Sequence, residues 1–316
     1  MDAAGLVTRT VADFVDAHLP PGAPVCVALS GGADSSALVA GALRAGLPVC
    51  ALVVDHGLQD GSAGVAAAAA DTARRLGASA QVLTVEVGTA GGLEAAARDA
   101  RYVALDDARD GRPVLLGHTA DDQAETVLLG LARGSGARSI AGMRPWREPW
   151  GRPLLGIRRT DTVTACAELG LQPHHDPHND DRRFTRVRLR SEVLPLLDDV
   201  LHGGVVDALG RTANALQADL DALDALADTQ WPAASVDGEL DVETIRGVPT
   251  AIRTRVVRRW LLAVGATEPT HRVISAVDAL VTDERSRGHV AIGGDPTARR
   301  VVIRSGQRLT VRLVER

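Results

Sequence analysis

The residues best suited to chemistry form a short loop, SGGADSS at 30–36, which follows an apolar run at 24–29. Glycines let backbone N–H groups approach a phosphate closely, and serine hydroxyls add further donors. A helical pattern begins directly after the loop, so the positive end of that helix would face a bound anion. The loop therefore predicts a phosphate site made of Ser30, Gly31, Gly32, Ala33, Asp34 and Ser35.

One residue of this loop, Asp34, is unexpected beside a phosphate, because its carboxylate would repel the anion. A divalent cation between the two removes the repulsion, so the loop implies Mg²⁺ as a cofactor. The alternative is a serine-rich turn in which Asp34 is an ordinary N-cap residue. All 35 basic residues of the chain are arginine. This excludes the phosphate loop that depends on a lysine, and it excludes covalent catalysis by a lysine amine.

A second group of polar residues, HTADDQAET at 118–126, opens another predicted helix. Asp122 and Glu125 lie three residues apart and therefore share one helix face. Such carboxylates can hold Mg²⁺, with Asp34 and Asp122 as the candidate ligands, or a cationic amine. Either Asp122 or Glu125 could act as the general base toward that amine. The other interpretation is a solvated acidic helix start, which the helix dipole alone would favour.

The elements that must position these groups alternate between short apolar runs and helical stretches. Strands are expected at 24–30, 48–56, 80–87 and 113–118, and helices at 34–45, 63–76 and 92–109. This order predicts an α/β fold with a parallel, Rossmann-like sheet covered by helices on both faces. Ligands bind beyond the carboxyl ends of such strands. Ser30, Asp55, His56 and His118 all follow strand ends, so we expect them to converge in one crevice.

The rest of the chain divides into a helical part and a smaller α+β part. Helices are expected at 121–131, 160–169, 184–197 and 208–228, two more within 249–282, and strands at 289–294, 299–306 and 308–315, with a loop rich in glycine, arginine and proline after residue 132. We interpret residues 1–200 as a catalytic domain, 201–232 as a helical linker and 233–316 as a small second domain.

Composition narrows the class of protein further. Hydrophobic residues make up 45% of the chain and charged residues 24%, which is typical of globular proteins. No apolar run approaches the roughly 20 residues that span a bilayer, and the acidic, amphipathic N-terminus does not resemble a signal peptide. We therefore expect no membrane partner. The three cysteines, Cys26, Cys50 and Cys166, form no CxxC pair, which suits a reducing cytoplasm.

Charge is distributed in blocks. Residues 133–190 contain twelve arginines and six acidic residues. Residues 245–316 contain fourteen arginines and six acidic residues, although the whole chain has a net charge of −5. Two basic blocks in an acidic chain indicate contact with a polyanion at defined places. The alternative is that these arginines form solvated surfaces.

The loop SGGADSS after a strand resembles the pyrophosphatase loop of the N-type ATP pyrophosphatases, which cleave ATP between the α- and β-phosphates. Further stretches are similar to one branch of that family, the tRNA(Ile)-lysidine synthases. These are GGLEAAARDARY at 91–102, GHTADDQAETVLLGLARGSGARSIAGM at 117–143, RPLL at 152–155 and DPHNDDRRFTRVRLRSEVLPLL at 176–197. Their order and spacing agree over about residues 24–200, and 249–316 is loosely similar to the family's C-terminal domain.

The resemblance implies a fold like that of the adenine nucleotide alpha hydrolases, ATP and Mg²⁺ as cofactors, and two further substrates. These are free L-lysine and a tRNA(Ile) with a CAU anticodon, whose wobble cytidine is adenylated and then attacked by lysine. It implies catalytic roles for Asp34, Arg98, Asp122, Glu125 and Arg190, with Arg98 facing the nucleotide. It also implies that Asp55, His56 and His118 contact ATP, and that tRNA phosphates are bound by Arg133, Arg138, Arg182, Arg183, Arg186 and Arg188.

One position departs from the family pattern. Members commonly have Asn in an FxRNxxR segment, whereas FTRVRLR places Val187 there. A contact that this Asn makes with RNA or nucleotide in other members would be lost at Val187, beside Arg186 and Arg190. Many members also dimerise, so a homodimer is an expectation here.

Other functions remain to be weighed against this one. A tRNA thiolase would share the loop and the adenylation step but usually needs a cysteine pair or an iron–sulfur cluster. A GMP synthetase would need an amidotransferase partner. A non-catalytic RNA-binding module would account for the arginine blocks but not for three polar strand ends in one crevice.

Overall fold

The computed structural model describes residues 1–58, 61–88, 92–134, 136–176, 180–267, 269–283, 288–294 and 298–315. Backbone contacts divide the chain into two compact units. The first comprises Met1–Ala132 and Gly142–Ala213, and the second comprises Arg133–Ala141 and Asn214–Arg316. The segment 133–141 thus belongs with the C-terminal unit although it lies between two parts of the N-terminal one.

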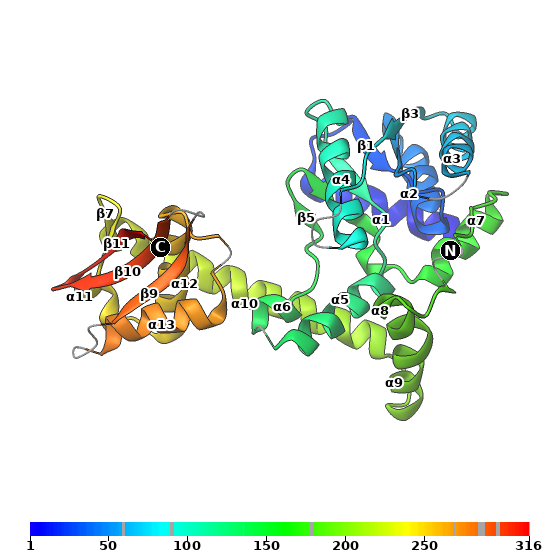
Figure 1. The fold of residues 1–316 in the computed structure, drawn as a ribbon. Coiled ribbons are helices and arrows are strands. Elements are labelled where there is room, and N and C mark those ends of the chain that lie inside the picture. The colour runs from blue at the N-terminus through cyan, green and yellow to red at the C-terminus, as the bar shows by residue number, and fades with distance from the viewer. Residues whose placement is uncertain are drawn as a thin grey trace. The chain divides into compact units, whose positions relative to one another are not determined.

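The first unit is built on a six-stranded sheet in the order β3-β2-β1-β4-β6-β5. Figure 1 labels β1, β3 and β5 of this sheet. The strands are β1 (Val25–Ala28), β2 (Val49–Asp55), β3 (Ser79–Thr84), β4 (Val114–Leu116), β5 (Trp146–Arg147) and β6 (Trp150–Gly151). All pairings are parallel except that of β5 with β6. The parallel sheet expected from the alternation of strands and helices is therefore present.

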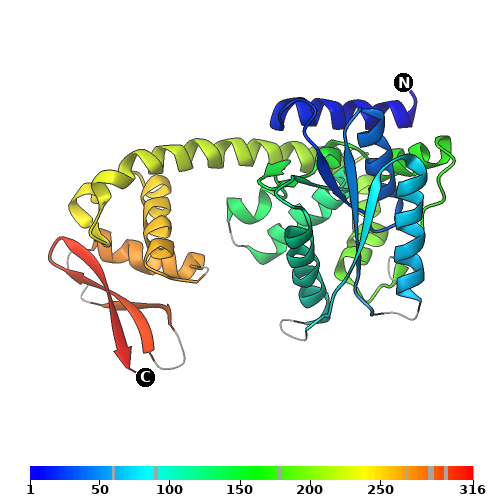
Figure 2. The ribbon, with the colours of Figure 1, turned by 90° about the horizontal axis from the view of Figure 1, so that it is seen from above.

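Helices cover both faces of this sheet (Figure 2). The helices of this unit are α1 (Ala3–His18), α2 (Ala33–Arg44), α3 (Ser62–Leu76), α4 (Leu93–Ala108), α5 (Ala120–Arg133), η1 (Pro153–Gly156), α7 (Arg159–Glu168), α8 (Thr185–Arg188), η3 (Leu189–Val193), α9 (Leu194–Val200) and the beginning of α10 (Val205–Ala234).

The side chains of β1 alternate between two cores. Val25 and Val27 pack into a cluster with residues of α1, α2, α3 and α7. Cys26 and Ala28 point to the opposite face, where they pack with Leu105 of α4. Because successive side chains of a strand face opposite ways, a strand buried on both sides reads as one continuous apolar run. This is why the sheet was recognisable from sequence.

The second unit contains α6 (Ala137–Ile140), most of α10, and a five-stranded antiparallel sheet in the order β7-β8-β11-β10-β9. Its other elements are β7 (Ser235–Val236), β8 (Glu239–Asp241), α11 (Val242–Arg246), α12 (Thr250–Ala263), α13 (His271–Thr282), β9 (His289–Gly294), β10 (Ala298–Ser305) and β11 (Arg308–Glu315). Trp260 of α12 is fully buried at its centre, and its indole N–H donates to the Gly238 carbonyl at 2.9 Å. A small core around one large aromatic ring holds this unit together.

Two features differ from the expectations. The loop expected after residue 132 contains α6 and the β5–β6 hairpin, which extends the sheet by two very short strands that no periodicity could reveal. The helix expected at 208–228 runs from Val205 to Ala234 and includes Pro232. Because proline has no N–H, Pro232 cannot donate to the carbonyl four residues earlier, so α10 lacks one backbone hydrogen bond near its C-terminal end.

Candidate active site

The loop at 30–32 connects β1 to α2 and folds around Ser35. The Ser35 hydroxyl accepts a hydrogen bond from the Ser30 N–H at 3.2 Å, lies 3.1 Å from the Ser30 hydroxyl and donates to the Gly32 carbonyl at 3.1 Å. Gly31 has a φ of 86°, a conformation that favours glycine. Gly32 is the N-cap of α2 and gives it no side-chain cap. The first N–H groups of α2 are therefore available to an anion.

The end of β4 approaches this loop closely. A Cβ atom on Gly117 would lie 3.0 Å from the Ser35 nitrogen and 3.1 Å from the Asp34 carbonyl carbon. A Cβ atom at this position would crowd the backbone of α2, so glycine favours the close approach that places His118 beside the first turn of that helix. Both residues line a cleft of about 810 Å³ together with Ser30, Asp34 and Asp122. The strand ends of β1 and β4 thus meet, as the sequence predicted.

The end of β2 lies at an adjoining cavity of about 340 Å³ that shares Ser30, Gly32 and Arg101 with the cleft and is lined also by Asp55 and His56. A hydrogen bond from the Gly57 N–H to Asp55 lowers the pKa of that carboxyl. Burial lowers the pKa of His56 and, much further, that of His118. Both imidazoles are therefore neutral at pH 7, and their buried Nδ1 atoms have no hydrogen-bond partner among the described residues.

Asp34 is not an N-cap, since it follows Gly32 by two residues and turns its side chain away from the loop. Its carboxylate accepts a hydrogen bond from the Thr162 hydroxyl and lies 3.1 Å from Nε of Arg159. Burial raises the pKa of Asp34, against the lowering effect of Arg159 and Thr162. The structure thus brings α7 to the phosphate loop.

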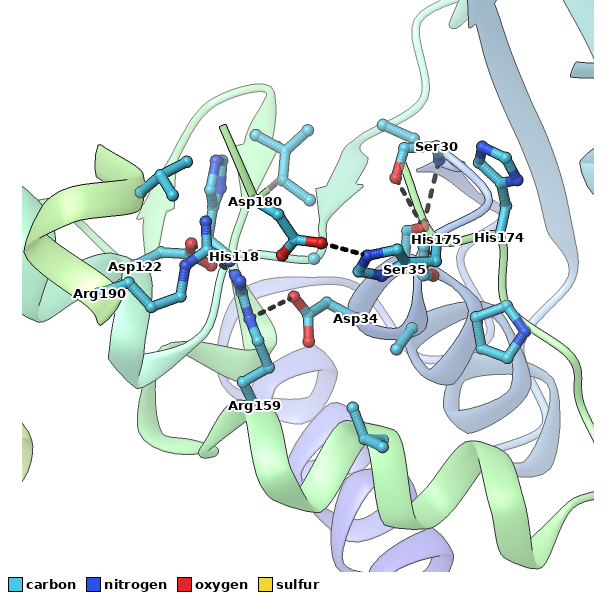
Figure 3. A pocket seen from close by; sticks show the side chains of 18 of the residues that line it. Ser30, Asp34, Ser35, His118, Asp122, Arg159, His174, His175, Asp180 and Arg190 are labelled. Atoms are coloured by element: carbon cyan, nitrogen blue, oxygen red, sulfur yellow. Dashed lines mark hydrogen bonds and ion pairs between the residues drawn. The ribbon is translucent and has the colours of Figure 1, made fainter. Parts of the chain in front are cut away.

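Arg159 also contacts the acidic residues of α5. Its Nη2 lies 2.9 Å from Asp122 Oδ1, so one guanidinium bridges Asp34 and Asp122 (Figure 3). Sequence reasoning missed Arg159 and Thr162, since nothing in the spacing of α7 distinguishes them from surface residues. The neighbouring Arg158 pairs with Asp121 through two contacts, at 3.0 and 3.2 Å.

Asp122, the second candidate ligand for Mg²⁺, also hydrogen-bonds with Thr119, the residue just before α5. Asp122 Oδ2 accepts hydrogen bonds from the N–H and the hydroxyl of Thr119, at 2.8 and 3.0 Å. Two carboxylates that reach one cation, beside a phosphate loop, fit Mg²⁺, which is commonly held by one or two carboxylates together with substrate phosphates. Among the described residues, no group of three or more His, Cys, Asp or Glu side chains could hold a metal by itself.

Glu125 lies behind the cleft and is 1% exposed. Arg186 Nη1 lies 3.4 Å from Glu125 Oε2, and Arg190 Nε lies 3.7 Å from Oε1. Burial, aided by the charge of Asp122, raises the pKa of Glu125 to about 7 despite these arginines. Arg190 lies in η3, a π-helical turn, and lines the cleft, whereas Glu125 is not among the described residues that line it.

The two arginines of α4 have different surroundings. Arg101 lines both cavities, and burial lowers its pKa. Arg98 donates to the Tyr102 hydroxyl at 3.3 Å, and its guanidinium carbon lies 5.0 Å from the centre of that ring. Among the described residues, the cleft lining includes Arg101 but not Arg98. Glu94, four residues before Arg98 in the sequence, has a side chain outside the described part of the chain.

The remaining candidate arginines are mostly paired with acidic residues. Arg182 lines the cleft and lies 3.8 Å from Glu192, which also contacts Arg188 at 3.1 Å. Arg183 forms a pair with Asp181. In the other unit, Arg138 contacts Asp224 at 2.5 Å, and Arg133 ends α5 on the surface.

The segment before α8 adds cleft residues that the sequence did not single out. The His174 N–H donates to the Gly31 carbonyl at 2.9 Å, which ties this segment to the phosphate loop. His175 and Asp180 line the cleft and contact each other at 2.7 Å (Figure 3). Val187 also lines it and is buried, so an apolar side chain occupies the position where the family commonly has Asn. Residues 177–179 of the DPHN stretch lie outside the described residues.

The phosphate loop lies at the carboxyl end of the first strand of a parallel sheet, and the acidic start of α5 lies beside it. Together these features define an ATP-binding PP-loop protein. The family model of the PP-loop domain matches residues 7–197, and that of the TilS substrate binding domain matches residues 240–310. The chain is 60% identical over 310 residues to a tRNA(Ile)-lysidine synthase of Nocardia farcinica, covering 97% of this chain and 98% of the relative. It is 57% identical to that of Rhodococcus jostii, covering 98% and 96%. The chain belongs to the tRNA(Ile)-lysidine synthase family.

Among solved structures, a U34-tRNA thiolase from Methanococcus maripaludis, described with its [4Fe-4S] cluster, matches with a TM-score of 0.55 and 18% identity, covering 68% of this chain and 79% of the other. At this identity the likeness concerns the fold alone. Within the described residues, no helix is both long and apolar enough to span a bilayer.

Proposed function

We propose that this chain ligates free L-lysine to carbon 2 of the wobble cytidine in a tRNA(Ile) with a CAU anticodon, using ATP. The product, lysidine, changes codon specificity from AUG to AUA and tRNA identity from methionine to isoleucine. The observation that carries the proposal is one cleft in which a phosphate loop meets acidic side chains of α5, in a chain that matches the family over nearly its whole length. The phosphate loop would bind ATP, and the carboxylates would bind a cationic amine and accept its proton.

The first step is adenylation of cytidine. The 2-carbonyl oxygen attacks the α-phosphorus of ATP, the bond to the β-phosphate breaks and pyrophosphate leaves. The first N–H groups of α2 and the hydroxyl of Ser30 would bind the departing pyrophosphate, and Asp55 and His56 line the cavity proposed for the nucleoside. We assign to α4 the arginine that offsets negative charge at phosphorus, through Arg98 or the cleft-lining Arg101.

The second step is attack of the lysine ε-amine on carbon 2, which expels AMP. The amine must lose a proton before or during attack, so a base is needed. Glu125, whose pKa is raised to about 7, is matched to that task, and Asp122 is the alternative base. Arg190 lies between the cleft and Glu125, where its charge can orient the carboxylate.

Asp34 and Asp122 are the residues that would hold Mg²⁺, because both reach the same guanidinium and therefore face one place. When bound, the metal would offset phosphate charge. In its absence, Arg159 supplies the positive charge that both carboxylates need.

The arginines would contact tRNA phosphates, which position an RNA without reading its sequence. Arg182 lines the cleft, and Arg133, Arg138, Arg183, Arg186 and Arg188 extend the basic set. Two kinds of tRNA carry CAU anticodons, so discrimination needs features beyond that triplet. We assign it to the arginine-rich region 233–316, separated from the catalytic region 1–200 by the helical linker 201–232.

The cysteines favour a ligase over a thiolase. Cys26, Cys50 and Cys166 are free and lie on β1, β2 and α7. Burial raises the pKa of both Cys26 and Cys166 to about 11, so neither is a ready nucleophile at pH 7. Reduced cysteines also suit the cytoplasm, where we place the enzyme. A homodimer is a further proposal, checked by light scattering.

Pyrophosphate release tests the adenylation half. We expect release from ATP when a tRNA(Ile) transcript with CAU is present, and none when adenosine, which has no 2-carbonyl oxygen, replaces the wobble cytidine. Asp34→Ala is expected to abolish it. Release that is independent of tRNA, or indifferent to the wobble base, would contradict the proposal.

A further inference from the structure

Arg159 is the cleft residue with the most unusual surroundings. Its guanidinium touches two carboxylates from different helices, Asp34 of α2 through Nε and Asp122 of α5 through Nη2. Figure 3 shows its side chain extending from α7 to a place between them. The side chains of Arg159, Asp34 and Asp122 are 28%, 19% and 18% exposed, so water screens their charges only in part.

A positive charge is needed at this place even before any substrate binds. Two partly buried carboxylates that face one place repel each other. The guanidinium of Arg159 contacts both and removes that repulsion. The free enzyme thus carries its own counter-ion.

The contacts of Arg159 are nevertheless less complete than those of two other arginines, Arg158 and Arg253. Two guanidinium nitrogens of Arg158 donate hydrogen bonds to the carboxylate of Asp121. Two nitrogens of Arg253 likewise donate to the carboxylate of Asp278, at 2.6 and 3.0 Å. Arg159 instead gives one nitrogen to each acid. Its buried Nε–H makes no hydrogen bond of good geometry with any described atom, although Asp34 lies 3.1 Å away. Paired two-nitrogen contacts are the strong ones, so this guanidinium is held less firmly.

On the basis of the proposed function, we propose that Arg159 is an internal counter-cation. It holds Asp34 and Asp122 in the free enzyme and gives them up to the cation that arrives with substrate. That cation is the divalent metal of the nucleotide or the ammonium group of lysine, since both are bound by carboxylates. The displaced guanidinium remains in the lining of the cleft, where phosphate is the partner that its charge favours.

This role differs from that of a purely structural ion pair, which would only hold α7 against α2 and α5. A structural ion pair would stabilise the site for every ligand, so its removal would weaken cation binding or leave it unchanged. A competing counter-cation lowers the apparent affinity for cations, so its removal must strengthen binding. If Arg159 occupies the two carboxylates in about nine tenths of the free enzyme molecules, its removal raises the apparent affinity for the cation about tenfold.

Cation binding by the free, full-length protein tests the proposal without tRNA. Mn²⁺, as a paramagnetic substitute for Mg²⁺, is titrated by electron paramagnetic resonance, and L-lysine by equilibrium dialysis. We expect Arg159→Met to bind one of the two about tenfold more tightly than the wild type, and the ligand that gains identifies the competing cation. Arg159→Lys, which keeps the charge, and Arg158→Met, which removes the neighbouring guanidinium, serve as matched controls without this gain.

The gain must depend on the carboxylates, so Asp34→Asn combined with Arg159→Met is expected to lose it. Thermal melting checks that each variant is folded, and Arg159→Gln replaces Arg159→Met if the latter does not fold. Unchanged or weaker binding of both ligands by the neutral variants would overturn the proposal. Failure of the wild type to ligate lysine to tRNA, with the Arg159 effect intact, would instead refute only the proposed function.

Discussion

Glu125→Gln is predicted to make the protein more stable at neutral and alkaline pH while impairing the ligase reaction. Glu125 is 1% exposed, and burial raises its pKa from the ordinary value of 4.5 to about 7. The folded state therefore binds a proton more tightly than the unfolded state does. The contribution of Glu125 to stability is fully present below about pH 4.5 and is lost as the pH rises through about 7.

The size of the loss follows from the pKa difference. At about 1.4 kcal/mol per pKa unit, ionised Glu125 lowers the free energy of unfolding by about 3 kcal/mol above pH 7. Arg186 and Arg190 lie at 3.4 and 3.7 Å and offset only part of the cost of burying the charge. Glutamine has nearly the same shape and stays neutral, so it removes the loss.

Urea denaturation from pH 5 to pH 8.5 measures the effect. The stability advantage of Glu125→Gln is expected to grow with pH toward about 3 kcal/mol at pH 8 and to shrink toward pH 5. Glu192→Gln, on the more exposed partner of Arg182 and Arg188, is the control and should change stability by less than about 0.5 kcal/mol. A variant less stable than the wild type at pH 8, or a difference independent of pH, would refute the reasoning.

Three further predictions concern the phosphate loop, the arginines of α4 and the C-terminal unit. Gly117→Ala places a Cβ atom 3.0 Å from Ser35 N, so we expect a loss of about 1–3 kcal/mol in unfolding and weaker ATP binding, measured by denaturation and calorimetry. Arg101→Met should lower the adenylation rate by more than about 100-fold. The same change at Arg98 should lower it by less, because Arg101 lines the cleft and Arg98 is not among the described residues that line it; equal losses in a pyrophosphate assay would contradict this. Arg253→Met leaves Asp278, whose side chain is 14% exposed, without its arginine partner, which should cost up to about 3 kcal/mol and expose the C-terminal unit to limited proteolysis while ATP binding is kept.

The sheet and the phosphate loop were predictable because their signals are local. Buried parallel strands read as apolar runs, and a loop that binds an anion needs glycine and hydroxyl residues next to a helix start. The meeting of Ser30 and His118 followed from topology alone, since parallel strands end at one edge of the sheet. The short hairpin β5–β6 has no such signal, because two residues per strand show no period.

The counter-ions of the site were not predictable. Arg159 lies 125 residues beyond Asp34 in the sequence, and it reaches the loop only because α7 packs against α1 and α2. The raised pKa of Glu125 likewise depends on burial, and its sequence context at the start of α5 suggested solvent exposure equally well. Burial and long-range pairing arise from tertiary packing, which spacing along one helix does not encode.

Incorporation of radiolabelled L-lysine into tRNA transcripts tests the central claim most directly. We predict that label enters an isoleucine tRNA with a CAU anticodon only when ATP is present, that it does not enter the methionine tRNA with the same anticodon, and that Asp34→Ala abolishes it. Absence of label from the isoleucine tRNA under conditions in which ATP is bound, or equal labelling of the two tRNAs, would contradict the account.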